Sequence, residues 1–156
     1  EPGEADAVVM AGMGGLLMRD LIKRGAERNL LPMQMILQPQ SDSMEIRRYL
    51  HSIGYEIIRE AFLKEDEKYY TVIQTKRTGH MSSDTEEKDR YGAYLLNHRD
   101  PVLYEYLEKE YQMLKKIQIS LQDRQTVSST KRIEIRLHEI EEDMERNRLA
   151  RAYYKM

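Results

Sequence analysis

The chain has 156 residues, of which 33% are charged and 40% hydrophobic, and its aromatic residues are eleven Tyr, one Phe and no Trp. Apolar material is therefore too thin for a uniformly globular body of this length, and we expect a small domain followed by an exposed helical extension. The formal net charge of −2 gives no bulk signature of nucleic-acid binding. Any basic binding surface has to be local.

The cysteine count and the hydropathy pattern restrict where the protein works. The chain contains no cysteine, which excludes disulfides and zinc–thiolate sites and fits a reducing cytoplasm. No run approaches eighteen apolar residues, and the acidic start at 1–4 does not resemble a signal peptide, so we expect no membrane partner. Because the sequence begins without Met, we also expect it to be a piece of a longer protein.

Strands and helices alternate in the first part of the chain. Residues 6–12 form an apolar run typical of a strand buried on both faces, residues 14–29 have helical spacing, and a second strand is expected over 33–39. Two strands joined by one helix make a right-handed βαβ unit, so the carboxyl ends of both strands lie at the same edge of the sheet. This connection predicts that residues 12–15 lie beside residues 38–40.

Three further elements complete a small sheet. A helix is expected over 43–52, followed by strands over 55–63 and 69–75. The connection between these two strands is short and charged, so they are expected to form an antiparallel hairpin. The predicted order β-α-β-α-β-β ends at a polar linker over 78–84.

Helical patterns replace strand patterns beyond this linker. A short helix over 86–97 precedes two long helices in which apolar residues recur at spacings of three and four, over 103–121 and 133–144. A polar break around 123–129 joins the two long helices. We therefore expect an antiparallel coiled-coil hairpin.

The cluster Gly12-Met13-Gly14-Gly15 is the candidate ligand turn. Glycines at the carboxyl end of a strand let the backbone approach a ligand, but such a cluster is first of all a tight turn, and both interpretations stay open. The chain lacks the Lys-Ser/Thr pair of a phosphate loop and the acidic residue that completes a dinucleotide fingerprint. A nucleoside triphosphate or NAD site is therefore disfavoured.

Other kinds of site have weaker support. The histidines at 51, 80, 98 and 138 fall in separate elements without metal-ligand spacing, so we expect surface residues and no metal site. No Gly-x-Ser-x-Gly elbow of a nucleophilic hydrolase is present. Tyr69 and Tyr70 have rings that can stack on a base, although aromatic residues are common in strands.

Charges in the helical region are nearly balanced, with twelve Lys and Arg against eleven Asp and Glu over 99–156. Near the end of the chain, residues 145–155 contain four cations and one carboxylate, Glu145, which gives a local charge of +3. The cations are Arg146, Arg148, Arg151 and Lys155. This group suits phosphate contacts, but it is equally favourable at a helix C-terminus, so both interpretations stay open.

Four motifs together resemble a known family. They are DAVVMAGMGGLL at 6–17, ILQPQ at 36–40, the stretch from Leu50 through GYEI at 54–57, and EDEKYY at 65–70. In combination and spacing they resemble the bacterial tRNA (adenine-N1)-methyltransferases of the TrmK type, which methylate an adenine near the D-arm of tRNA with S-adenosylmethionine. The resemblance covers roughly residues 5–78, and the helical region matches in layout.

The resemblance implies an α/β fold class: the C-terminal half of a Rossmann-like S-adenosylmethionine-dependent methyltransferase sheet, followed by an α-helical antiparallel coiled-coil hairpin. It implies a partial methyltransferase domain at 1–80 and a helical domain at 81–156. In the family, a glycine-rich loop and an acidic residue on earlier strands hold the cofactor. We therefore expect this chain to be inactive alone and its first strand to be an unpaired sheet edge.

The resemblance also implies roles for the glycine turn. The base and the methyl group would be positioned by Gly12, Met13 and Gly14, and S-adenosylmethionine would contact Ala11, Gly12 and Met13. Because the N1 atom of adenine carries a free lone pair at neutral pH, the transfer depends on positioning more than on a general base.

Contacts with the tRNA substrate are implied at two places, the rim of the turn and the end of the last helix. They are Gly15, Gln38, Pro39, Arg146, Arg148 and Arg151. Self-association through the coiled coil or the exposed sheet edge is a further expectation. Two alternatives stay open: a non-catalytic RNA-binding or adaptor module, and a methyltransferase with another substrate.

Overall fold

The computed structural model describes residues 3–156, which form two compact units, one up to His98 and one from Arg99 to Met156. Residues 81–98 thus pack with the sheet, whereas the division into functional domains at 80 and 81 stays a prediction. No helix within residues 3–156 combines the length and the apolar content needed to cross a membrane.

The first unit is built on a four-stranded mixed sheet with the order β1-β2-β4-β3. Its strands are β1 (Ala7–Met13), β2 (Gln34–Pro39), β3 (Tyr55–Glu65) and β4 (Lys68–Arg77). β1 and β2 run parallel, and β4 runs antiparallel to both β2 and β3. The expected βαβ unit and the expected hairpin are confirmed.

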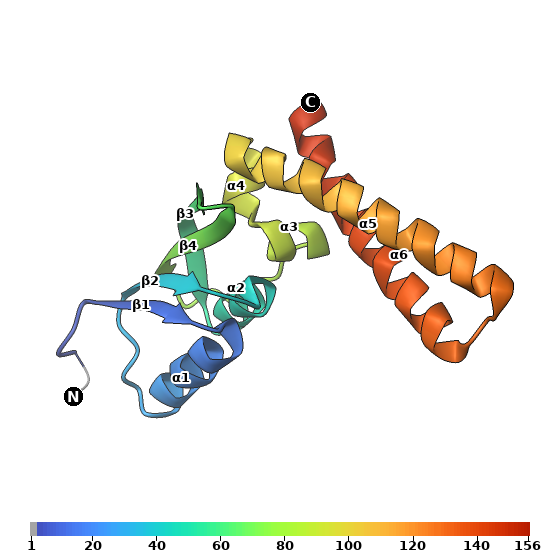
Figure 1. Cartoon of the computed structure of the whole chain (residues 1–156). Helices are drawn as coiled ribbons and strands as arrows, with labels where there is room; N and C mark the ends of the chain where they lie inside the picture. The colour runs from blue at the N-terminus through green and yellow to red at the C-terminus, as the bar shows by residue number, and fades with distance from the viewer. Residues whose placement is uncertain (1–2) are drawn as a thin grey trace. The chain divides into compact units, whose positions relative to one another are not determined.

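Helices α1 (Gly15–Glu27) and α2 (Ser43–Ser52) lie on one face of this sheet (Figure 1). Apolar side chains from both helices and three of the strands meet there and form the core; they are Met18, Ile22, Met35, Leu37, Ile46, Leu50, Tyr55 and Ile73. The Tyr55 hydroxyl, although buried, donates a hydrogen bond of 2.5 Å to the Pro32 carbonyl oxygen. This packing fixes the carboxyl ends of β1 and β2 relative to α2.

β1 lies at the edge of the sheet. Its Val9 is 68% exposed, and the neighbouring Ile36 on β2 is 37% exposed. The expectation of a strand buried on both faces is therefore wrong for this chain. β1 pairs with β2 alone, and α1 and α2 lie on the face of the sheet opposite to Val9 and Ile36. The expected unpaired sheet edge is confirmed.

Residues 86–97 form two short helices, α3 (Glu86–Tyr91) and α4 (Ala93–Asn97), where a single helix was expected. Gly92 separates them with a φ of +96°. A Cβ atom at this position would lie 2.9 Å from the carboxyl carbon of the buried Glu60 on β3. The positive φ interrupts the helix, and glycine is required at this position because the Glu60 side chain occupies the space that a Cβ atom would need.

Arg47 on α2 is buried and joins three segments of the first unit. Its Nε donates to Glu60 Oε1 at 2.8 Å, and both side chains are almost completely inaccessible. Its Nη1 donates to the carbonyl oxygens of Asp89 and Arg90 at 2.9 and 2.8 Å. These bonds hold α3 against α2 and β3.

The second unit is a hairpin of two long helices, α5 (Pro101–Val127) and α6 (Lys131–Ala152), which pack antiparallel and end in a 3-10 turn at Tyr153–Lys155 (Figure 1). The Asp100 carboxylate caps α5 by accepting from the Leu103 N–H at 2.9 Å. The connecting turn takes only residues 128–130, so the polar break around 123–129 was placed too early.

Polar and apolar side chains share the buried stripe of the hairpin. Of the expected apolar positions, five are buried and five are half-buried; the buried ones are Leu103, Leu107, Leu114, Leu137 and Ile140, and the half-buried ones are Tyr111, Ile117, Leu121, Ile133 and Met144. Among them, the fully buried Asn147 donates from Nδ2 to Glu110 Oε2 at 2.9 Å and to the Leu107 carbonyl oxygen at 3.0 Å.

Candidate functional site

β1 ends in a bulge at Gly12. The strand ladder pairs Ala11 with Gln38 and Met13 with Pro39, so Gly12 has no residue opposite it. Its φ of +75° lies in the region that costs a residue with a side chain about 1–2 kcal/mol. Its N–H donates to Gln38 Oε1 at 2.9 Å. A side chain of β2 thus holds the turn that follows β1.

The next part of the turn is held by backbone groups. The Gln40 N–H donates to the Met13 carbonyl oxygen, and the Gly15 N–H donates to the Ser41 carbonyl oxygen, both at 2.9 Å. A Cβ atom on Gly15 would lie 2.8 Å from the Asp42 carbonyl oxygen. Position 15 therefore excludes every side chain, and the turns after β1 and β2 touch backbone to backbone.

The other two glycines have more room. A Cβ atom on Gly14 would meet the Ser41 hydroxyl oxygen at 3.1 Å, whereas nothing lies within 4 Å of a Cβ atom built on Gly12. Gly12 therefore borders open space. A molecule placed there would meet backbone instead of a side chain.

The structure brings the predicted residues of the glycine turn together with those at the end of β2. Within this group the exposure differs: Ala11 and Gly12 are exposed, Met13, Gly14 and Gln38 are half-buried, and Gly15 and Pro39 are buried. The exposed members offer a surface to a ligand, and the buried members support it.

Residues 11–15 and 38–40 contain no titratable side chain. Gln38 uses its amide oxygen for the Gly12 N–H, while its amide nitrogen has no acceptor among residues 3–156. The turn can therefore orient a ligand through backbone groups and one amide. It offers no group of its own for proton transfer.

The predicted arginine contacts on α6 all have acidic partners. Arg146 pairs with Asp143 at 3.0 Å, Arg148 with Glu145 at 2.7 Å, and Arg151 with Glu108 on α5 at 2.6 Å; the Arg151 guanidinium also lies 4.3 Å from the centre of the Tyr111 ring. Their role in substrate binding stays a prediction. A phosphate would have to compete with these carboxylates.

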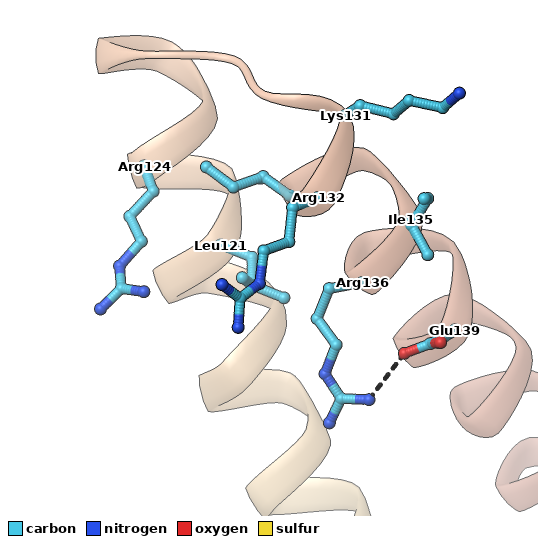
Figure 2. Close-up of a pocket in the computed structure, with 8 residues that line it drawn as sticks. Leu121, Arg124, Lys131, Arg132, Ile135, Arg136 and Glu139 are labelled. Atoms are coloured by element: carbon cyan, nitrogen blue, oxygen red, sulfur yellow. Dashed lines mark hydrogen bonds and ion pairs between the residues drawn. The ribbon is translucent and has the colours of Figure 1, made fainter.

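A second group of cations gathers where α5 and α6 meet their connecting turn, and we call it the basic tip: Arg124, Lys131, Arg132 and Arg136 (Figure 2). They line a groove of about 900 Å³ that contains one carboxylate, Glu139. Arg136 pairs with this carboxylate at 2.8 Å. Within residues 3–156 the other three have no acidic partner, so four cations and one carboxylate give the groove a charge of +3.

The basic tip was missed from the sequence because its members come from both sides of the turn. One signal was present: Lys131 and Arg132 occupy the start of α6. Cations at a helix N-terminus oppose the helix dipole at a cost of a few tenths of a kcal/mol each. The two cations are therefore placed unfavourably for the helix itself.

Comparison with known proteins identifies the family. Residues 1–142 match the family model described as TrmK, tRNA (adenine(22)-N(1))-methyltransferase. The chain belongs to the TrmK family. A curated relative, the tRNA (adenine(22)-N(1))-methyltransferase of Bacillus subtilis, is 39% identical over 71 residues, which are 46% of this chain and 30% of the relative.

Solved structures of TrmK proteins have the same fold. The crystal structure of the B. subtilis M1A22 tRNA methyltransferase TrmK matches with a TM-score of 0.81 and 26% identity, over 96% of this chain and 64% of that one. The structure of M. capricolum TrmK in complex with the cofactor product S-adenosyl-homocysteine matches with a TM-score of 0.74 and 20% identity, over 95% and 60%. The chain thus spans less than two thirds of these relatives.

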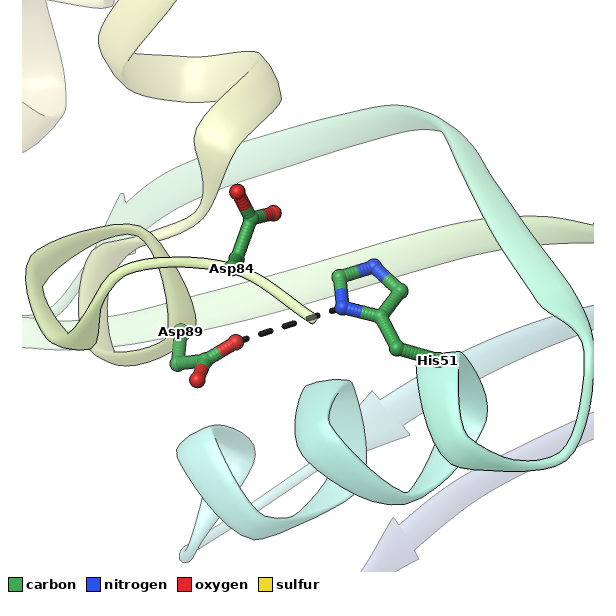
Figure 3. A group of neighbouring side chains, drawn as sticks. All are labelled: His51, Asp84 and Asp89. Carbon is green, nitrogen blue, oxygen red and sulfur yellow. Dashed lines mark ion pairs between the residues drawn. The ribbon is translucent and has the colours of Figure 1, made fainter. Parts of the chain in front are cut away.

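The prediction that all four histidines of this TrmK chain lie at the surface is wrong. His80, His98 and His138 are exposed as expected, but His51 at the end of α2 is only 8% exposed. It is buried because the linker and α3 fold back over the end of α2, and its Nδ1 lies 4.0 Å from Asp89 Oδ1 (Figure 3). No sequence spacing indicated this approach, since His51 and Asp89 belong to separate helices.

Proposed function

We propose that the protein to which this chain belongs transfers a methyl group from S-adenosylmethionine to N1 of an adenine in the D-arm region of tRNA. The observation that carries the proposal is the bulged glycine turn at the ends of two parallel strands, in a chain whose residues 1–142 match the TrmK family. The activity is proposed for the whole protein, because the chain spans only part of its relatives.

The open space at Gly12 fits a bound cofactor. Nothing occupies the position where a side chain would lie, and the adjacent Ala11 is exposed, so the backbone of Ala11, Gly12 and Met13 would hold S-adenosylmethionine. When bound, this group supplies an electrophilic methyl carbon. The chain's own contribution is to hold the turn in place through Gln38, Gln40 and Ser41.

The turn would act by positioning the base. Adenine N1 is a nucleophile without deprotonation, which agrees with a turn that has no titratable side chain. Gly12, Met13 and Gly14 would align N1 with the methyl carbon, and the amide nitrogen of Gln38 would donate to an acceptor on the base. The methylated base gains positive charge, which backbone carbonyl oxygens of the turn would stabilise.

The helical hairpin would contact the body of the tRNA. A base inside folded RNA has to leave its stack to reach an enzyme site, so contacts away from the base must hold the RNA. We assign phosphate contacts to the basic tip, because phosphates would repay the unfavourable placement of Lys131 and Arg132 at the start of α6. Arg146, Arg148 and Arg151 remain candidate contacts.

The first experiment tests the glycine turn in the full-length protein. We expect Gly12→Ala to lower kcat/KM for methyl transfer to an unmodified tRNA transcript by about 100-fold, since a displacement near 1 Å has an effect of this size. The matched control is Gly79→Ala in the linker, where φ is +74° and the space is equally open. Equal activity of the two variants would contradict the assignment.

Nucleoside analysis of the same reactions separates the alternatives. N1-methyladenosine in the transcript supports the proposal. Tight tRNA binding without any methylated product favours the adaptor alternative. Methylation of another acceptor, with the transcript unchanged, favours a different substrate.

The second experiment tests the basic tip with the 156-residue chain. We expect the double variant Lys131→Gln/Arg132→Gln to weaken tRNA binding and to lower the slope of log K against log salt by about 1.5, for two lost phosphate contacts. Lys115→Gln/Lys116→Gln removes an exposed pair of equal charge from the middle of α5 and is the control. Equal losses in both variants would show that net charge alone matters.

A further inference from the structure

Three side chains converge at one place in the first unit, away from the glycine turn. His51 lies in the last turn of α2, Asp84 in the linker and Asp89 in α3 (Figure 3). One ligand atom from each lies within 4.8 Å of the other two. His51 is far in the sequence from Asp84 and Asp89, so the fold brings it to the two carboxylates.

Two atoms of the cluster are buried without a partner. Among residues 3–156, His51 Nδ1 and Asp89 Oδ1 make no hydrogen bond, although the two residues are only 8% and 5% exposed. Their separation of 4.0 Å is too long for a hydrogen bond between them. Buried polar atoms of native proteins nearly always have a partner, and no protein group within residues 3–156 supplies one for these two atoms.

Each carboxylate of the cluster has one cationic neighbour. Arg48 Nε donates a hydrogen bond to Asp89 Oδ2 at 3.1 Å, and Lys88 Nζ lies 3.5 Å from Asp84 Oδ1. Each carboxylate therefore keeps one oxygen for another partner.

We propose that His51 Nδ1, Asp84 and Asp89 Oδ1 bind one divalent metal ion, with Zn²⁺ as the best fit. One imidazole nitrogen and two carboxylate oxygens are ligands that Zn²⁺ accepts, whereas Mg²⁺ and Ca²⁺ prefer oxygen alone. The three ligand atoms all lie within 4.8 Å of one another, and Zn²⁺ bonds of about 2.1 Å would draw them closer together. The adjacent cavity of about 280 Å³, which His51 and Asp84 line, has space for a fourth ligand such as water.

The ion would act on structure. The start of α2 adjoins the glycine turn through Ser41 and Asp42, whereas His51 lies about 12 Å further along the helix at 1.5 Å per residue. From there the ion would fasten the linker and α3 to the end of α2. This role lies outside the proposed methyl transfer.

The test is a titration of the chelator-treated 156-residue chain with ZnCl₂ by calorimetry, together with thermal unfolding. We expect one Zn²⁺ per chain and an unfolding midpoint that rises with added zinc. His51→Gln and Asp84→Asn should each weaken zinc binding by at least about tenfold. Asp84→Asn changes a residue of the linker and keeps the binding test valid if His51→Gln fails to fold.

The control is His138→Gln. His138 faces Glu142 at 3.4 Å on the surface of α6, a pair that can also attract zinc. Zinc binding that survives in Asp84→Asn and is lost in His138→Gln would overturn the proposal, as would a chain that binds no zinc. Binding that is lost only in the cluster variants supports it, whatever the result of the methyl-transfer assay.

Discussion

Glu60 in the sheet unit and Glu110 in the helical hairpin are both buried, but their partners differ. In the sheet unit Glu60 faces the guanidinium of Arg47 at 2.8 Å, and this arginine also binds two carbonyl oxygens of α3. In the hairpin Glu110 accepts from the uncharged amide of Asn147 at 2.9 Å and from the Tyr106 hydroxyl at 3.3 Å. The first arrangement joins distant segments, and the second joins two neighbouring helices.

The difference follows from how each unit is built. α3 and α4 have six and five residues and contribute three side chains to the buried core, Tyr91, Leu95 and Leu96. The Arg47 network adds polar contacts that hold α3 in place. The two long helices already share a continuous apolar stripe, but a repeating stripe allows the helices to slide by a turn. One buried polar pair such as Asn147 with Glu110 can select a single register, at some cost in stability.

The largest effect is expected when the charged network is cut. Arg47→Met leaves the Glu60 carboxylate buried without its partner and should lower the free energy of unfolding by about 3–5 kcal/mol. Urea titration followed by circular dichroism measures this loss. Arg19→Met, which breaks only exposed ion pairs with Asp20 and Glu45, should cost about 0–1 kcal/mol. Similar losses in the two variants would contradict the role of the network.

A smaller loss of stability is expected when the buried polar pair of the hairpin is broken. Asn147→Ala removes a donor from the buried Glu110 and should cost about 1–3 kcal/mol. The double variant Glu110→Leu/Asn147→Leu should regain this stability, since apolar groups of similar size replace the polar pair. Cysteine cross-linking between the helices should then trap more than one register. A double variant that is less stable than Asn147→Ala would exclude this account.

Helix caps provide a finer test within the hairpin. Asp100→Ala removes the acceptor of the Leu103 N–H and should cost about 1 kcal/mol. Thr130→Ala removes the longer and exposed bond of 3.3 Å to the Ile133 N–H, so its effect should be smaller. Thermal unfolding of both variants gives the order, and the reverse order would contradict it.

The smallest effect at neutral pH concerns Tyr154. Its hydroxyl donates to the Asp100 carbonyl oxygen at 2.8 Å, and burial together with the Asp100 charge raises the pKa of Tyr154 above its ordinary value of 10.0. Above pH 10 the unfolded chain releases this proton first, so the stability of the hairpin should fall as the pH rises. Tyr154→Phe should reduce this fall in urea titrations at pH 9 and pH 11, and an unchanged pH dependence would show that Tyr154 does not contribute.

Much of the fold could be predicted from the sequence. The βαβ unit, the hairpin of β3 and β4 and the two long helices follow from local periodicity and from turn residues. The approach of the glycine turn to Gln38 followed from the parallel pairing of two strands that are joined by a helix. Each of these features depends on residues that are close in the sequence or on a general rule of topology.

The features that were missed depend on contacts between distant segments. The break at Gly92 requires Glu60 of β3, and the burial of His51 requires α3 to fold back. The basic tip combines cations from two helices, of which only Lys131 and Arg132 had a local signal. A single sequence contains these residues but does not state which of them meet.

The contact between Gly15 and the Ser41–Asp42 backbone separates the ways in which the turn can fail. A side chain at position 15 would push the two βα turns apart and damage folding, whereas one at position 12 enters open space and would leave the core intact. Position 15 is thus constrained by folding, whereas a side chain at position 12 is expected to affect the turn without unfolding the core. Redesign of this turn should leave position 15 untouched and vary the loop at 39–42 only together with the glycines, since the two loops are joined backbone to backbone.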